Sequence, residues 1–221
     1  MSTHATKKDL YQALSRVAQA LGNGNRLQLL EFMAQGERTV EALAVLTGMS
    51  IANASQHLKA LRQAGLVIPR KEGQRVYYRV AGDDVVRLYD MLRSVAEGRI
   101  AEVKALVGQF LGNKDGLEPV PANELMDRLK RGLVTVLDVR PPEEFAAGHL
   151  PGAVNIPLEK LENCLAKLSK RREVVAYCRG PYCLMSFEAV LKLRELGWKA
   201  RRLQDGFPEW KAAGLPVESQ R

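Results

Sequence analysis

Apolar residues near the start of the chain recur every three or four positions, which is the spacing of an amphipathic helix. The pattern predicts a first helix over residues 9–21, ended near Gly22. It predicts a second helix that follows a cap at Asn25 and stops at Gly36. Each apolar stripe needs a partner against which to pack.

The next two helices are predicted to be joined by a tight turn. The third should begin near Thr39 and end at Gly48, and the fourth should run from a cap at Ser50 to Gly65. Two helices joined by so short a turn match a helix-turn-helix, in which the second helix can enter the major groove of DNA.

The fourth predicted helix has two different faces. Ala54, Leu58 and Leu61 share an apolar face and should pack into the core. Short polar, amide and basic side chains occupy the outward face, where they can bond base edges or phosphates; a face that only contacts solvent is the alternative. The candidate DNA-contacting residues on this helix are Asn53, Ser55, Gln56, Lys59 and Arg62.

Residues 66–80 predict a β-hairpin with a basic tip. Two strand-like runs flank the turn at residues 71–74, and alternation directs Val76, Tyr78 and Val80 toward the core. A hairpin in this place is suited to contact an adjacent DNA backbone or the minor groove. Its candidate DNA-contacting residues are Lys71, Arg75 and Arg79.

The helices and hairpin of residues 21–80 resemble the winged helix of the ArsR family of bacterial regulators, and the resemblance spans about the first 100 residues. It implies a dimer that binds a double-stranded DNA operator. Two sensor sites of the family are missing, because Glu37 to Glu41 stands where metal-sensing members place cysteines and the fifth predicted helix has no histidine. His4 and His57 alone cannot form a chelating cluster. No metal site is predicted, and an inducer must be sensed elsewhere.

A long apolar stripe follows the hairpin. Asp83 and Asp84 should cap a fifth helix, along which apolar residues keep one face for about seven turns, to Phe110. A small domain cannot cover such a stripe alone. Residues 9–21 and 83–111 are therefore predicted to form a homodimer interface, with packing on the second half of the chain as the weaker alternative.

Helices and strands alternate after a polar, glycine-bearing segment at residues 112–118, which is predicted to be a linker. Such alternation is typical of an α/β domain with a parallel sheet and helices on both faces. The predicted elements are a helix at 122–130, a strand at 134–137, a helix at 142–147, a strand at 153–156, a helix at 158–168, a strand at 174–177, a helix at 187–196, a strand at 200–203 and a last helix around Trp210. The chain should thus hold a mostly α winged helix-turn-helix domain at 1–111 and an α/β domain at 119–221.

The buried strand at residues 174–177 ends in a loop bounded by two cysteines. Backbone N–H groups in such a turn, together with the dipole of the following helix, stabilise a thiolate or a bound anion. A buried cysteine that acts only as a small apolar side chain is the alternative, and we assign that structural role to Cys164. The candidate reactive loop residues are Cys178, Arg179, Gly180, Tyr182 and Cys183.

This loop, with the segments Val136 to Pro157 and Leu203 to Val217, resembles the rhodanese family over about residues 119–217. The resemblance implies that Cys178 carries sulfane sulfur as a persulfide. Many family members have an arginine five residues after this cysteine, and Cys183 in its place argues against ordinary thiosulfate turnover while leaving sulfur binding intact. Asp138, Arg140 and His149 are expected to be scaffold residues, with His149 as a catalytic base the minority interpretation.

Composition agrees with two globular domains. The chain has 221 residues, of which 46% are hydrophobic and 26% charged, and its formal net charge is +8. The first half is the more basic, and a concentration of positive charge from Gln56 to Arg79 favours a phosphate-contacting surface. The N-terminus lacks an apolar signal core, so we expect a cytoplasmic protein with no membrane partner. In that compartment the cysteines are better explained as reactive or metal-binding residues than as structural disulfides.

These features predict a dimeric DNA-binding repressor whose rhodanese-like domain senses reactive sulfur at Cys178 and Cys183 without a bound cofactor. The sulfane sulfur donor would be a polysulfide, thiosulfate or a persulfide. One alternative is a rhodanese-type sulfurtransferase with an autoregulatory DNA-binding domain. Another is an arsenite or soft-metal sensor that uses both thiolates as ligands.

Overall fold

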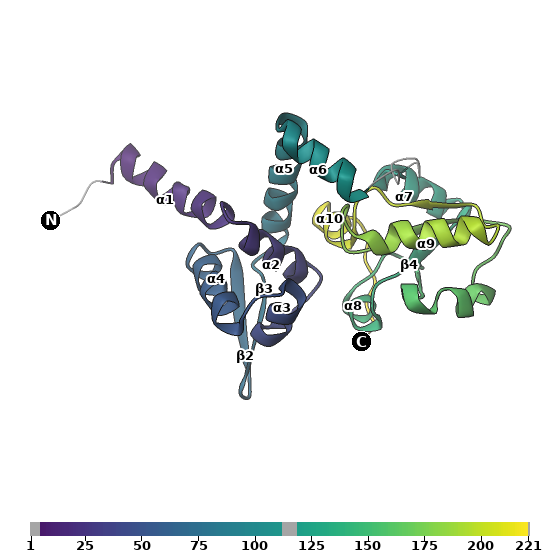
Figure 1. Ribbon diagram of the computed structural model, residues 1–221, viewed down its shortest axis with the longest axis horizontal. Coiled ribbons are helices and arrows are strands. Elements are labelled where there is room, and N and C mark those ends of the chain that lie inside the picture. Colours follow the sequence, from purple (N-terminus) through teal and green to yellow (C-terminus); the bar gives the residue numbers. More distant parts are fainter. Residues whose placement is uncertain (1–4, 112–118, 221) are drawn as a thin grey trace. The chain divides into compact units, whose positions relative to one another are not determined.

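The computed structural model describes residues 5–111 and 119–220 (Figure 1). The chain divides into two compact units, Met1–Tyr89 and Asp90–Arg221, and each is described by itself. The predicted linker at 112–118 and His4 lie outside the described residues. Among the helices of the described ranges, none has both the length and the apolar composition that crossing a membrane requires.

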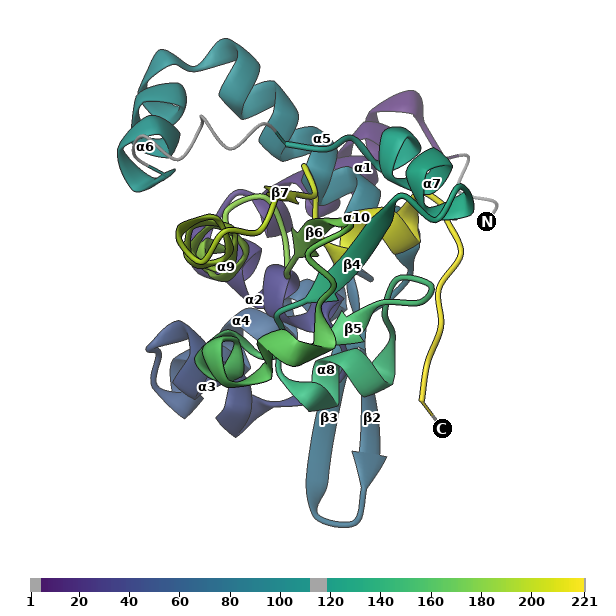
Figure 2. The same ribbon diagram turned by 90° about the vertical axis from the view of Figure 1, so that its right-hand side faces the viewer.

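The first unit is a winged helix-turn-helix, as predicted. Figure 1 shows α2, α3 and α4 gathered around a small sheet, with α1 projecting away from it, and Figure 2 shows β2 and β3 as a long hairpin. The sheet is antiparallel with strand order β1-β3-β2. Its elements are α1 (Lys7–Leu21), α2 (Gly24–Ala34), β1 (Arg38–Thr39), α3 (Val40–Thr47), α4 (Ile51–Gln63), β2 (Val67–Glu72) and β3 (Arg75–Val80).

Local capping explains where these helices begin and end. Thr39 and Ser50 cap α3 and α4 through side chains that accept backbone N–H bonds, and Gly48 ends α3 in the left-handed conformation with φ 68°. The cap predicted at Asn25 is wrong, because Asn25 lies inside the first turn of α2. Asn23 is the cap, and its side chain accepts from the Arg26 N–H at 3.2 Å.

The core of the first unit is built from the apolar faces that the sequence predicts. Leu58 and Leu61 of α4 are fully buried and pack with Leu29, Leu43 and Val67. Ala54 is also fully buried, so the predicted inner face of α4 is confirmed. The opposite face of α4 stays exposed, which leaves it available to a partner.

The single fifth helix predicted from residue 83 is wrong. The structure has two helices, α5 (Asp83–Arg99) and α6 (Ala101–Leu111), with a break at Ile100. Gly98 stands just before the break, and glycine is about 1 kcal/mol less favourable than alanine within a helix. Asp83 and Asp84 lie in the first turn of α5 rather than before it, where carboxylates complement the helix dipole.

The second unit contains a four-stranded parallel sheet of order β5-β4-β6-β7, which confirms the α/β prediction. The helix predicted at 158–168 is wrong, since this segment forms two 3₁₀ helices, η2 (Leu158–Lys160) and η3 (Glu162–Lys167). Its hydrogen bonds close after three residues instead of four, as in short connecting segments. The remaining elements are α7 (Ala122–Lys130), β4 (Val134–Asp138), α8 (Pro142–Ala147), β5 (Val154–Asn155), β6 (Glu173–Tyr177), α9 (Leu184–Glu195), β7 (Ala200–Arg202) and α10 (Phe207–Ala212).

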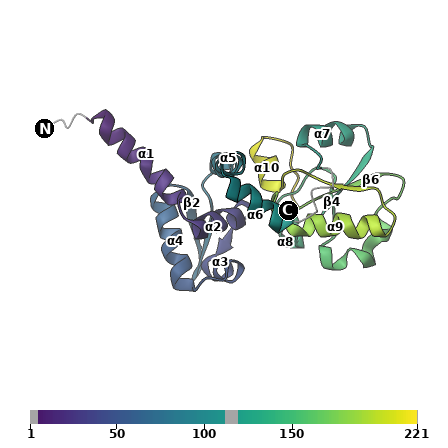
Figure 3. The same ribbon diagram turned by 45° about the horizontal axis from the view of Figure 1, so that its top comes forward.

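Strand β6 is buried on both faces of this sheet. Val174 and Ala176 pack with the apolar face of α9, whereas Val175 and Tyr177 pack with α7 and α10. Figure 3 shows α7 and α9 on opposite sides of β4 and β6. A central strand covered on both sides is typical of parallel sheets, and it fixes the position at which the cysteine loop leaves the sheet.

Candidate functional site

The cysteine loop lies at the carboxyl end of β6, where ligands of open α/β sheets bind. Cys178 follows the strand directly and is 1% exposed, and Cys183 immediately precedes α9. The two residues form a disulfide, with 6.2 Å between their Cα atoms. The fold therefore brings both candidate thiols together, while their reactivity stays a prediction.

The segment before α10 packs closely against this loop. The Phe207 N–H donates to the Cys178 carbonyl at 3.1 Å. Gly206 faces the loop backbone so closely that a Cβ placed on it would lie 2.5 Å from the carbonyl carbon of Arg179. Only a glycine fits this approach, so the loop and the start of α10 are held as one body.

Arg179 is tied to α8 by an ion pair. Its Nε lies 3.1 Å from both carboxylate oxygens of Glu144, and its terminal nitrogen donates to Oε1 at 2.8 Å. Glu144 is 3% exposed, so the pair is shielded from solvent and both partners depend on each other. The structure thus gives Arg179 an anchoring contact that the sequence alone does not reveal.

Tyr182 contacts α5. Its hydroxyl donates to the Glu97 carboxylate, and the Arg93 guanidinium lies 5.8 Å from the ring centroid. Neither Glu97 nor Arg93 was predicted to belong to the site. No sequence signal could have found them, because the contact joins positions 85 residues apart.

Asp138, Arg140 and Tyr177 form a buried polar network below the loop. Arg140 and Asp138 are fully buried and pair at 2.7 Å, and the Tyr177 hydroxyl donates to the same carboxylate. Burial, and then the charge of Asp138, raise the pKa of Tyr177, which keeps its hydroxyl protonated. Arg140 also donates to the Gly148 carbonyl at 2.7 Å, so the network supports the turn that carries His149.

His149 has structural partners on both ring nitrogens. Its Nδ1 lies 2.8 Å from the Phe145 carbonyl, to which it must donate, and its Nε2 lies 3.6 Å from the Glu218 carboxylate. The ring also stacks on Phe145 with 3.7 Å between centroids. These contacts suit the scaffold role expected for Asp138, Arg140 and His149.

Two carboxyl groups beside the loop have raised pKa values. Burial raises the pKa of Glu209 to about 7, against backbone hydrogen bonds and the charge of Arg93, which lower it. Burial likewise raises the pKa of Asp205. Glu209 accepts from the Gly206 N–H at 3.0 Å, so it fixes the segment that packs on the cysteine loop.

Glu209→Gln should therefore raise the free energy of unfolding at pH 8.5 by on the order of 2 kcal/mol and leave it nearly unchanged at pH 4. A raised pKa means that the folded state still holds a proton that the unfolded state has released. The native chain should thus lose stability as pH rises from about 4.5 to about 7. Denaturant unfolding at both pH values measures the effect, with exposed Glu188→Gln as the control. Equal responses of the two variants would contradict the assignment.

The predicted DNA-contacting side chains lie on α4 and on the wing, which is the hairpin of β2 and β3, and all of them are exposed. Asn53, Ser55, Gln56, Lys59 and Arg62 come from α4, and Lys71, Arg75 and Arg79 come from the hairpin. Arg70, which was not among the candidates, bonds Glu37 at 2.7 Å and Glu72 at 2.7 Å. This pair of contacts ties the wing to the residue before β1.

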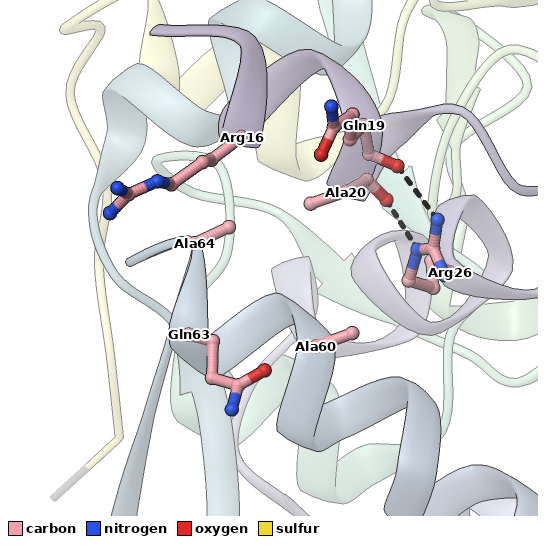
Figure 4. Close-up of a pocket in the computed structure, with 7 residues that line it drawn as sticks. All are labelled: Arg16, Gln19, Ala20, Arg26, Ala60, Gln63 and Ala64. Atoms are coloured by element: carbon pink, nitrogen blue, oxygen red, sulfur yellow. Dashed lines mark hydrogen bonds between the residues drawn. The ribbon is translucent and has the colours of Figure 1, made fainter. Parts of the chain in front are cut away.

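An open pocket of about 320 Å³ lies between α1, α2 and α4 (Figure 4). Arg26 donates to the carbonyls of Gln19 at 2.8 Å and Ala20 at 2.5 Å, as the dashed lines in Figure 4 show. A guanidinium at this place satisfies carbonyls at the end of α1 and complements the helix dipole. Arg26 therefore fixes α1 on α2.

Large apolar side chains stay exposed on the helices predicted to form an interface. On α1, Leu10, Tyr11 and Leu14 are each more than half exposed. The exposed apolar residues on α5 and α6 include Met91, Val95, Leu106 and Phe110. These exposed side chains suit the predicted homodimer interface, which stays a prediction.

Cys164 is the free cysteine of the described residues, and it packs, partly buried, against the core cluster that contains Cys178. Its environment fits the structural role assigned to it. Within residues 5–111 and 119–220, no group of three or more histidine, cysteine or acidic side chains is placed to hold a metal ion.

A helix-turn-helix with an exposed basic wing, followed by a parallel α/β domain with a cysteine loop, defines a regulator with an added rhodanese-like domain. Comparison with known families agrees. The family "Bacterial regulatory protein, arsR family" matches residues 23–68, and the "Rhodanese-like domain" family matches residues 121–213. The HTH-type transcriptional regulator Rv0324 of Mycobacterium tuberculosis is 48% identical over 212 residues, covering 96% of this chain and 93% of the relative. The chain belongs to the ArsR-family DNA-binding transcriptional regulators that carry a C-terminal rhodanese-like domain.

Two further relatives each match one half of the chain. A sulfurtransferase of Allochromatium vinosum is 32% identical over 85 residues, covering 38% of this chain and 78% of the relative. A solved structure of the homodimeric winged helix-turn-helix DNA-binding domain from Mycobacterium bovis is 48% identical. The match covers 45% of this chain and 94% of the solved structure's chain, with a TM-score of 0.41.

Proposed function

We propose that this regulator is a homodimeric repressor that senses reactive sulfur through Cys178 and Cys183. The observation that carries the proposal is the pairing of the two cysteines across one loop, between the end of β6 and the start of α9. The exposed apolar side chains of α1, α5 and α6 support the homodimer. We place DNA binding and dimerisation in residues 1–111 and sulfur sensing in residues 119–221.

The proposed chemistry starts from the reduced pair. The Cys178 thiolate attacks the sulfane sulfur of a polysulfide, forms a persulfide and releases a shorter polysulfide as the leaving group. The Cys183 thiolate then attacks the Cys178 sulfur, forms the disulfide and expels hydrosulfide. Two thiols are oxidised and one sulfane sulfur is reduced to sulfide, so the electrons balance. A Cα separation of 6.2 Å is within the range of disulfides and permits the second step.

Brief treatment of the reduced protein with polysulfide should yield the Cys178–Cys183 disulfide and free hydrosulfide. In Cys183→Ser the reaction should stop at a persulfide on Cys178, because the attacking thiol is gone. Mass spectrometry of alkylated peptides distinguishes the two products. Cys164→Ser is the matched control and should react as the native chain does, whereas added sulfur that collects on Cys164 would show that the reactive loop is wrongly placed.

The similarity to a sulfurtransferase favours a second candidate function, in which the loop passes sulfur to an acceptor and DNA binding only regulates the chain's own synthesis. Continuous turnover of thiosulfate with cyanide would favour this enzyme. A single reaction with polysulfide, without turnover, that changes DNA affinity would favour the sensor.

A further inference from the structure

We infer that Glu97 and Arg93 of α5 are positioning residues for the cysteine loop. Through their contacts with Tyr182, they link the state of Cys178 and Cys183, either a disulfide or separate thiols, to α5, which begins in the DNA-binding unit. The inference rests on the proposed function and names the residues that would carry its regulation. It makes Tyr182 a part of signal transfer rather than of sulfur chemistry.

The contacts converge on one loop side chain. Tyr182 immediately precedes Cys183, and its hydroxyl donates to the Glu97 carboxylate. Arg93 bonds Glu97 at 3.2 Å, pairs with Asp90, and lies over the Tyr182 ring. One turn of α5 thus holds the loop through a hydrogen bond and a cation–π contact.

Arg93 also reaches the segment that packs behind the loop. Its terminal nitrogen lies 3.7 Å from the Asp205 carboxylate, next to Gly206, which approaches the loop backbone. The Arg93 side chain is 15% exposed, so solvent screens these interactions less than it screens a surface pair. The loop, the start of α10 and α5 therefore share one partly buried charge cluster of Asp90, Arg93, Glu97, Tyr182 and Asp205.

Opening or closing the Cys178–Cys183 disulfide must alter these contacts. The disulfide closes a short ring that includes Tyr182, whereas two thiols, or a thiol and a persulfide, must separate to non-bonded distance. Since Tyr182 is bonded directly to Cys183, it cannot keep its place unless the rest of the loop adjusts. We expect the Tyr182–Glu97 hydrogen bond to differ in strength between the oxidised and reduced states.

Helix α5 is suited to carry the difference along the chain. Its first turn contributes Val85 to the core of the first unit, and its residues from Asp90 onward belong to the second unit. α5 crosses the boundary of the two units as one uninterrupted helix, in which each turn is hydrogen-bonded to the next. Linkage is reciprocal, so a loop state that weakens operator binding must itself be disfavoured by bound operator.

The test measures this reciprocal effect in the full chain. Reduced dithiothreitol exchanges with the protein disulfide to give the protein dithiol and oxidised dithiothreitol, and alkylation followed by mass spectrometry gives the equilibrium constant. Saturating operator DNA should make the native disulfide at least about 5-fold easier to reduce; a tenfold change corresponds to about 30 mV. In Tyr182→Phe and in Glu97→Gln the effect of DNA should fall below about 2-fold.

The variants separate failure of the inference from failure of the proposed function. Glu97→Gln changes a residue of α5 outside the cysteine loop, and it should still form the disulfide with polysulfide in the absence of DNA. Glu102→Gln, an exposed change on α6, should keep the native response. If DNA still makes the disulfide easier to reduce in both Tyr182→Phe and Glu97→Gln, as in the native chain, the inference is wrong. The proposed sensor function would not be affected by that result. A native pair that forms no disulfide and releases no hydrosulfide with polysulfide would overturn the proposed function itself.

Discussion

Raising the salt concentration from 50 to 200 mM should weaken binding of the full-length protein to duplex DNA by on the order of 10³-fold. The reason is counterion release, because each phosphate neutralised by a basic side chain frees a condensed cation. Five candidate basic residues per protomer lie exposed on α4 and the wing, so a dimer can make the six to ten contacts for which a loss of about 10³ to 10⁵ is typical. These basic residues are Lys59, Arg62, Lys71, Arg75 and Arg79. Fluorescence anisotropy across a salt series measures the slope.

Single substitutions should distinguish the residues that contact phosphates from the residues that contact base edges. Arg75→Ala and Lys71→Ala should weaken binding to all sequences alike, and each should lower the salt slope by about one, because one phosphate is then no longer neutralised. Gln56→Ala and Asn53→Ala should instead change the sequence preference, since amides read base edges. Lys104→Ala on α6 is the charge-matched control and should leave both properties unchanged. Affinity that responds neither to salt nor to any of the four changes would falsify the DNA-contacting surface.

Periodicity predicted the winged helix well because its signals are local. A helix that buries one face repeats its apolar residues every turn, and caps such as Thr39 and Ser50 mark where the repeat begins. The α/β order and the position of the cysteine loop followed from short apolar runs that end in turn residues. Both cysteines of this loop could be named as well, since Cys183 lies in the same loop as Cys178, and the structure pairs them.

Where prediction failed, the deciding interactions were weak or distant. The break at Ile100 interrupts an apolar stripe that continues on both sides, so the pattern alone could not locate it. The 3₁₀ segments at 158–167 keep apolar spacing close to that of an α-helix. The bonds from Tyr182 to Glu97 and from Arg179 to Glu144 join residues far apart in sequence, and only the fold brings them together.

Polysulfide should lower the affinity of the native protein for its operator by about 5- to 150-fold, the range that corresponds to 1–3 kcal/mol of coupling. A dimer must place its two recognition helices about one DNA turn apart, so a modest rotation of one protomer breaks one of two half-site contacts. Cys178 and Cys183 lie in the loop that contacts α5 through Tyr182, and α5 begins in the DNA-binding unit. A change at the loop can therefore reach α5 through the hydrogen bond of Tyr182 to Glu97, and α5 continues into the unit that holds the recognition helix.

Mobility shift on the DNA upstream of the chain's own gene, with and without polysulfide, measures this effect. Cys178→Ser should bind operator as the reduced native protein does and respond hardly at all, because the first sulfur transfer cannot occur. Cys164→Ser should keep the native response, which separates loss of the reactive loop from loss of any thiol. Equal responses from the native chain and from Cys178→Ser would show that the loop has no part in regulating DNA binding. The sulfurtransferase would then be the better account of the second domain, with sulfur chemistry and DNA binding as independent activities of one chain.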